Sequence, residues 1–75
     1  MMKHEHYILR EFKPKLDADI SIDKKYANLS VWINYADSHS EIIFDRRCAD
    51  EAEALEIMNG FGHGFEYLGV CWERV

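Results

Sequence analysis

Apolar and polar side chains alternate without a break in residues 16–23, the segment LDADISID. Leu16, Ala18, Ile20 and Ile22 form one set, and every residue between them carries a side-chain oxygen. A period of two places the two sets on opposite faces of a β-strand, whereas a helix would spread both around its surface. The segment therefore predicts a strand with one face toward the core.

Residues 27–35 repeat this alternation and give the clearest strand signal in the chain. The apolar set is expected to face the core, which places Trp32 and Asn34 together on the opposite, polar side. Residues 36–40 are rich in Asp and Ser, as turns commonly are. The pattern predicts a hairpin from about residue 28 to residue 46, with EIIFDR as its second strand.

A single helix is predicted over residues 49–59, which consist largely of strong helix formers. Acids crowd its first turns, where the helix dipole favours them, and Gly60 is expected to end it. Spacings of three predict that its inward stripe consists of Ala52, Leu55, Met58 and Phe61.

Two further strands are predicted at the ends of the chain. Residues 7–12 are rich in β-forming side chains, and Pro14 stops the strand because its nitrogen cannot donate to a sheet. Residues 65–74 form the last strand. Its alternation is blurred, which fits a strand that is covered on both faces or lies centrally in the sheet.

Four to five strands and one helix predict an α+β fold of two layers. The helix, at about residues 49–59, is expected to pack on one face of a mainly antiparallel sheet. With 75 residues and no internal repeat, the chain is expected to form a single domain over residues 1–75.

Charge and cysteine content narrow the partners and the compartment. A net charge of -5 disfavours phosphate backbones and anionic membranes, so we expect a protein partner with a basic surface and no direct contact with nucleic acid or membrane. Cys48 and Cys71 are too few for a secreted disulfide framework, and no apolar run resembles a signal peptide or a membrane span. These features predict a soluble, cytoplasmic protein.

Asp17, Asp19 and Asp23 form an acidic row on the polar side of the strand at residues 16–23. The row does not fit a calcium loop of the helix-loop-helix type, because Ile22 and Asn28 occupy the positions of its glycine and its bidentate glutamate. Three alternatives stay open. The carboxylates could mimic nucleic-acid phosphates, face a basic partner, or form a solvated face that protects a sheet edge from aggregation.

Residues with catalytic or metal-binding chemistry do not converge in the sequence. His4 and His6 share one side of an extended chain, but no further ligand follows at a recognisable spacing, so a frayed N-terminus is favoured over a metal site. The glycine-rich loop around His63 follows a helix, whereas a phosphate-binding loop precedes one. No nucleophile elbow or CxxC pattern occurs. We expect a non-enzyme with no catalytic residues, no metal and no cofactor.

Trp32 is the strongest candidate for a binding residue. A large aromatic side chain among small amides and hydroxyls is typical of an interface, where tryptophan is a favoured anchor. The alternatives are that Trp32 covers a neighbouring side chain or lies in a homodimer contact. Phe65, Tyr67 and Cys71 are expected to extend the same face. The predicted partner-binding residues are Trp32, Asp17, Asp19, Asp23, Asn34 and Tyr67.

Residues 58–70, MNGFGHGFEYLGV, are similar to the end of a family of small bacterial and phage domains without an assigned activity. In that family a helix ends in Leu-Asn, a glycine pair follows, and the last strand begins Trp-Glu-Leu-Val. The residues that match in kind are Asn59, Gly62, Gly64, Glu66 and Val70. The chain departs from the pattern in having one residue fewer between the glycines and Phe65 in place of tryptophan. The resemblance implies a closing strand after the helix and no function.

In size and acidity the chain also resembles, without a shared motif, the small phage proteins that inhibit host defence nucleases, the anti-CRISPR-like inhibitors. The leading hypothesis is therefore a non-catalytic protein-binding module, of the phage-inhibitor type, that occludes a host defence or nucleic-acid-handling complex. The alternative is a ligand- or metal-responsive regulatory domain that uses His4, His6, His63 or the glycine loop.

Overall fold

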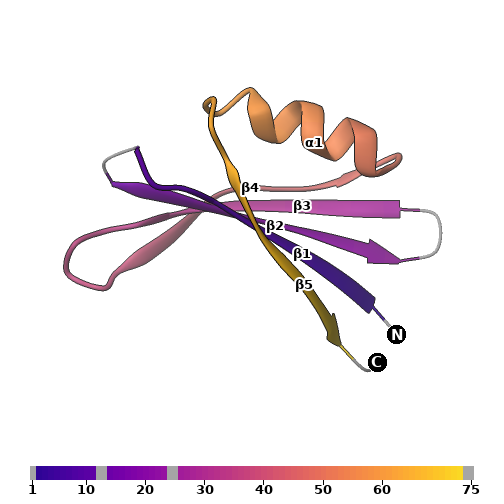
Figure 1. Cartoon of the computed structure of the whole chain (residues 1–75), viewed down its shortest axis with the longest axis horizontal. Helices are drawn as coiled ribbons and strands as arrows, with labels where there is room; N and C mark the ends of the chain where they lie inside the picture. Colours follow the sequence, from indigo (N-terminus) through magenta and orange to yellow (C-terminus); the bar gives the residue numbers. More distant parts are fainter. Residues whose placement is uncertain (1, 12–13, 24–25, 74–75) are drawn as a thin grey trace.

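The computed structural model describes residues 2–11, 14–23 and 26–73, with side chains for all of these except residues 2 and 71–73. Five strands and one helix follow one another along the chain (Figure 1). They are β1 (Met2–Leu9), β2 (Lys15–Asp23), β3 (Tyr26–Asn34), β4 (Ser40–Cys48), α1 (Glu51–Asn59) and β5 (Glu66–Glu73).

The five strands form one sheet in the order β4-β3-β2-β1-β5, and every neighbouring pair is antiparallel. The helix lies across one face of this sheet (Figure 1). The predicted fold class is thereby confirmed. The prediction that the last strand could be central or covered on both faces is wrong, because β5 is an edge strand that pairs only with β1. Its blurred pattern reflects an exposed edge.

β1 begins earlier in the sequence than predicted. It includes His4, Glu5 and His6, which were expected to fray, and it ends at Leu9. β2 and β5 flank β1 on its two sides and give its backbone groups partners over nearly the whole length. Because those partners come from distant segments, the local sequence did not reveal that the N-terminus is a strand.

The core lies between the helix and the sheet. In the antiparallel register Ala18 faces Val31, and Ile20 faces Leu29, so the apolar sets of β2 and β3 share one face. The helix places Ala54 and Met58 on them. The buried cluster consists of Ala18, Ile20, Ala27, Leu29, Val31, Cys48, Ala54 and Met58.

The inward stripe of α1 differs from the predicted one at one position. Ala52 is exposed, and Ala54 is fully buried instead. Met58 is buried as predicted, Leu55 packs partly against the core, and Phe61 meets Phe44 of β4 edge to face at 5.4 Å. A spacing of four between the two buried residues fits the period of an α-helix better than the three assumed from sequence.

β2 is the central strand, with β1 on one side and β3 on the other. A strand in this position cannot be a calcium loop, and the strand prediction for residues 16–23 is confirmed. The idea that its acids protect a sheet edge is wrong for the same reason, because β2 has no free edge. Within the described ranges, no helix is long and apolar enough to cross a membrane.

Candidate functional site

The face of the sheet opposite α1 carries most of the polar side chains of the strands, and we call it the open face. Antiparallel partners share a face, so the register assigns its members directly. It contains His4, His6 and Ile8 of β1, Lys15, Asp17, Asp19, Ser21 and Asp23 of β2, Tyr26, Asn28, Ser30, Trp32 and Asn34 of β3, Ser40, Ile42, Asp45 and Arg47 of β4, and Glu66 of β5.

His4, Asp19 and Ser21 form a hydrogen-bonded group on this face. Nδ1 of His4 lies 3.0 Å from Oδ2 of Asp19 and 2.9 Å from Oγ of Ser21, and the Ser21 hydroxyl donates to Asp19 over 3.0 Å. In a catalytic triad the serine and the acid contact different ring nitrogens of the histidine. Here both contact Nδ1, so the three groups do not have the geometry of a proton relay to serine.

His6 and Asp17 form a second pair beside the first. Nε2 of His6 lies 3.1 Å from Oδ1 of Asp17, whose exposed fraction is only 8%. The edge of the His6 ring also faces Trp32, with ring centroids 5.7 Å apart and planes at 77°. Aromatic pairs favour this arrangement. Trp32 is thus held in place from β1 while part of its ring stays accessible.

Trp32 has an exposed apolar neighbour that the sequence analysis did not single out. Ile42 is its cross-strand partner on β4 and is 65% exposed. On the other side, Asp17 separates Trp32 from Ile8 in the same row of the sheet. An exposed aromatic and an exposed isoleucine in adjacent positions form an apolar spot within a polar face, as at the centre of many interfaces.

Asp45 organises the neighbouring part of the face. Its Oδ1 accepts hydrogen bonds from the Asn28 side-chain amide at 2.9 Å and from the Ser30 hydroxyl at 3.3 Å. These contacts join β3 to β4, and they leave the polar groups around Trp32 with fixed partners. A surface whose side chains are ordered before binding loses less conformational entropy when a partner arrives.

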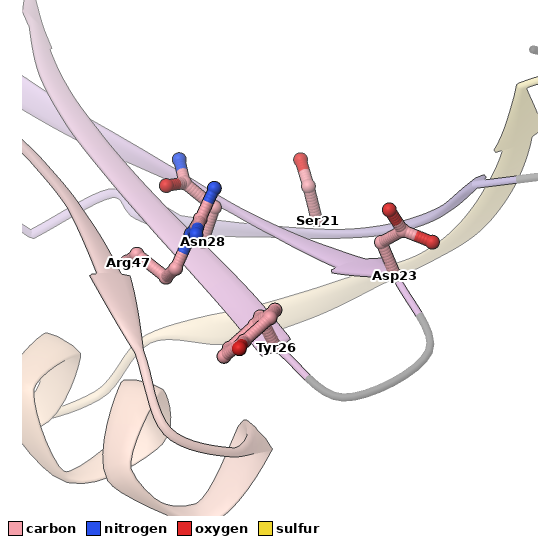
Figure 2. A pocket seen from close by; sticks show the side chains of 5 residues that line it. All are labelled: Ser21, Asp23, Tyr26, Asn28 and Arg47. Carbon is pink, nitrogen blue, oxygen red and sulfur yellow. The ribbon is translucent and has the colours of Figure 1, made fainter.

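A shallow depression of about 290 Å³ lies at one end of the open face. Figure 2 shows Arg47 and Asn28 toward one side of it and Asp23 toward the other, with Ser21 between and Tyr26 below. The Arg47 guanidinium carbon lies 4.8 Å from the centroid of the Tyr26 ring, a cation–π distance. The depression therefore has charges of opposite sign at its two ends.

The structure brings most of the predicted site residues together. Trp32, Asn34, Asp17, Asp19 and Asp23 all lie on the open face. The acidic row is less free than expected, because Asp17 contacts His6 and Asp19 contacts His4. Of the three aspartates, only Asp23 is exposed.

Tyr67 lies on the other side of the sheet. Its cross-strand partner is Tyr7, with ring centroids 5.2 Å apart, and Tyr7 packs against the core beneath α1. Phe65 also packs against that core. The expectation that Phe65 and Tyr67 extend the Trp32 face is therefore wrong, and the side chain of Cys71 lies outside the described part of the chain. The register shift between His6 and Tyr7, which no local pattern predicts, decides which β5 residues face the helix.

Titratable groups with shifted pKa values lie on the helix side of the sheet. Burial, and then the carboxylates of Glu5 and Glu51, raise the pKa of Tyr7 to about 12. A hydrogen bond to Glu5, and then burial, raise the pKa of Glu51. Burial, and then the charge of Glu53, raise the pKa of the Cys48 thiol. Shifted groups often mark active sites, but Glu51 belongs to α1, Tyr7 and Cys48 lie in or against the core, and none of the three lines the depression.

No group of three or more His, Cys, Asp or Glu side chains is placed to hold a metal ion in the parts of the chain that the structure describes. His63 is exposed in the loop between α1 and β5. The features that sequence reasoning missed are the partners of the histidines and the pairing of Arg47 with Tyr26. The alternation of His4 and His6 indicated that the two histidines share a face, but it did not identify their partners. Comparison of the chain with protein-family models, with curated proteins and with solved structures finds no match.

Proposed function

We propose that the chain is a small non-catalytic protein-binding module that acts through the open face of its sheet. The observation that carries the proposal is the placement of Trp32. Its ring is partly accessible, contacts the edge of the His6 ring and lies next to the exposed Ile42. Its polar neighbours Asp17 and Ser30 already have hydrogen-bond partners. A rigid aromatic anchor with a polar surround matches the anatomy of a binding hot spot.

Charge supports a partner with a basic surface. The chain has a net charge of -5, and Asp23 offers an exposed carboxylate at the end of the face. Opposite charges on two partners raise the association rate more than the final affinity. The finer form of the proposal is a phage-type inhibitor that covers a basic surface of a host defence or nucleic-acid-handling complex in the cytoplasm. Its support is the acidity and small size of the chain.

The decisive variant is Trp32→Ala. We expect it to weaken binding to the partner by at least tenfold, since hot-spot truncations cost about 2 kcal/mol or more. The partner is identified by pull-down with the tagged wild-type chain, and affinity is then measured by titration calorimetry with the purified partner. Circular dichroism and thermal unfolding should show that the variant stays folded.

Tyr35→Ala is the matched control, because Tyr35 is an exposed aromatic that follows β3, stacks on His39 and has no ring contact with Trp32 among the described residues. We expect this variant to bind the partner as the wild type does. A Trp32→Ala chain that is folded and binds with unchanged affinity would refute the proposal.

The depression lined by Arg47 and Asp23 favours a second candidate, a ligand-responsive regulatory domain. Its volume is at the lower end of the range of roughly 300–1,000 Å³ that small-molecule sites occupy. A thermal-shift screen with nucleotides, amino acids and divalent metals tests it. Stabilisation that disappears in Arg47→Ala would favour this function.

A further inference from the structure

We infer that two copies of the chain associate through the β4 edge, as antiparallel neighbours in one continuous ten-stranded sheet. The inference rests on the charge order of β4 and on its exposed apolar residues, and it does not depend on the proposed function. β4 pairs with β3 on one side only, and it is nine residues long. An edge of this length has a row of backbone groups that can pair with another strand.

β4 exposes two large apolar side chains next to each other. Ile42 is 65% exposed and Ile43 is 41% exposed. Soluble proteins commonly protect edges with charges or proline. β4 has charged residues on both sides of the two isoleucines, but none between them. An edge with exposed isoleucines is a favourable site for a further strand.

The charges of β4 are arranged to complement an antiparallel copy of the same strand. Glu41 lies near its start, whereas Arg46 and Arg47 lie near its end. Within the described part of the chain, none of the three forms an ion pair. An antiparallel second copy brings the start of one strand next to the end of the other, so acid meets base on both sides of the symmetry axis.

The bulge in β4 selects one register for this pairing. Phe44 pairs with Val31 but Ile42 pairs with Trp32, so Ile43 is an extra residue. Cross-strand partners must face the same side of the sheet. Glu41 and Arg46 both lie on the helix side, because their partners on β3 are Ile33 and Leu29. The register that sets Glu41 opposite Arg46 of the second copy therefore matches faces.

This register also sets Ile42 opposite Asp45, and Ser40 opposite Arg47, with each pair on the open face. Ile43 of each copy then lies opposite Phe44 of the other, and the two-fold axis passes between these two pairs. The axis is perpendicular to the sheet, so both helices lie on one side and both open faces on the other. A partner with two matching sites would therefore meet two Trp32 spots on one surface, which raises avidity.

The other edge strand does not offer the same match. Antiparallel pairing of β5 with its own copy over the whole strand would set Glu66 opposite Glu73, two acids. Like charges directly opposite each other destabilise a strand pair. Glu66 already pairs with Arg10 at 2.8 Å in the same chain. β4 is thus the edge whose charges favour association with a second copy.

The test is the oligomeric state of the full chain by sedimentation equilibrium over rising concentration. The wild type should shift from 8.9 kDa toward twice that mass. Glu41→Arg alone places Arg opposite Arg, and Arg46→Glu alone places Glu opposite Glu. We expect each to weaken the dimer by about tenfold or more, because the change acts at two symmetric positions.

The two single variants rescue each other in this geometry. When Glu41→Arg and Arg46→Glu chains are mixed, each contact across the heterodimer pairs Arg with Glu, so the mixture should dimerise although each component alone does not. The double variant E41R/R46E should dimerise by itself. Val70→Lys on β5, at a 45% exposed position, is the control and should leave the dimer unchanged.

A bulge can also turn an edge strand away from pairing. A wild type that stays monomeric at about 1 mM, where even weak complexes form, would overturn the inference. The bulge at Ile43 would then be a feature that prevents pairing at this edge. A dimer that survives both charge reversals, or that Val70→Lys dissociates, would overturn it too. Because the readout is mass, the result is independent of whether Trp32→Ala loses its protein partner.

Discussion

Glu5 is the residue whose position is hardest to reconcile with its charge. It lies in β1 on the helix side with an exposed fraction of 8%, and its Oε1 is 3.4 Å from Nζ of Lys3. The other carboxylate oxygen, Oε2, is buried, and no described residue donates a hydrogen bond to it. When Glu51 of α1 is protonated, its carboxyl can donate to Glu5, and this contact raises the pKa of Glu51. Protonated Glu51 can thus link the helix to the strand through this hydrogen bond.

This pair predicts a pH dependence of stability with a definite sign. An acid whose pKa is raised by folding stabilises the folded state at low pH. The contribution is complete below the ordinary Glu pKa of 4.5 and is lost as pH rises through the raised value in the folded protein. Glu51→Gln keeps a donor to Glu5 at every pH. We therefore expect its unfolding free energy to exceed that of the wild type by a margin that grows from pH 4 to pH 7.

Chemical denaturation at several pH values measures this margin, and Glu53→Gln is its control. Glu53 is also an acid of the first turn of α1. Glu53→Gln therefore removes the same charge from the helix N-terminus, where it interacts with the helix dipole, and leaves the contact with Glu5 intact. The control should show the pH profile of the wild type. Parallel profiles for the wild type and Glu51→Gln would contradict a hydrogen bond from protonated Glu51 to Glu5.

At the scale of elements, α1 shows how a local signal fixes a boundary. Asp50 has extended backbone angles, and its side chain accepts a hydrogen bond from the Glu53 N–H at 2.9 Å. The Glu53 carboxylate in turn accepts from the Ala49 N–H at 3.4 Å. Such reciprocal contacts satisfy N–H groups that the helix itself leaves without acceptors. The first residue of α1 is therefore set by the side chains of Asp50 and Glu53.

Asp50→Ala should destabilise the protein by about 1 kcal/mol, the usual cost of losing an N-cap side chain. Asp50→Asn keeps an oxygen acceptor at the same place and should retain most of the stability. Urea unfolding followed by circular dichroism measures both. Equal losses in the two variants would show that the charge of Asp50, and not its capping contact, stabilises the helix.

At the scale of the whole molecule, the reactivity of Cys48 reports on unfolding. This thiol is 1% exposed in the cluster between β3, β4 and α1, and burial raises its pKa, so little thiolate is present or accessible in the folded state. Alkylation of Cys48 by iodoacetamide should therefore require unfolding. For a stability of about 5 kcal/mol, we expect labelling to be slowed by roughly 10³-fold or more relative to the denatured chain.

Peptide mass spectrometry distinguishes Cys48 from Cys71 in this experiment. Met58→Ala, which removes a buried side chain of α1, should cost about 2–4 kcal/mol and speed the labelling of Cys48 accordingly. Rapid labelling of Cys48 in a wild type that remains folded by circular dichroism would mean that α1 detaches locally from the sheet.

The sequence by itself determined the two middle strands, the helix and the buried faces of β2 and β3. The alternation in residues 16–23 and 27–35 was enough to predict β2, β3 and the polar position of Trp32, because a period of two is a property of neighbouring residues. The helix and its acidic start followed from propensity for the same reason.

Only the tertiary structure decided the order of the strands and the contacts that depend on it. The pairs His4 with Asp19, His6 with Asp17, and Tyr26 with Arg47 join residues 11 to 21 positions apart, and each requires a particular neighbour and register. The free β4 edge and the exposed β5 edge likewise follow from the order β4-β3-β2-β1-β5. No local periodicity encodes strand order, because pairing between distant segments is chosen by how all of them pack at once.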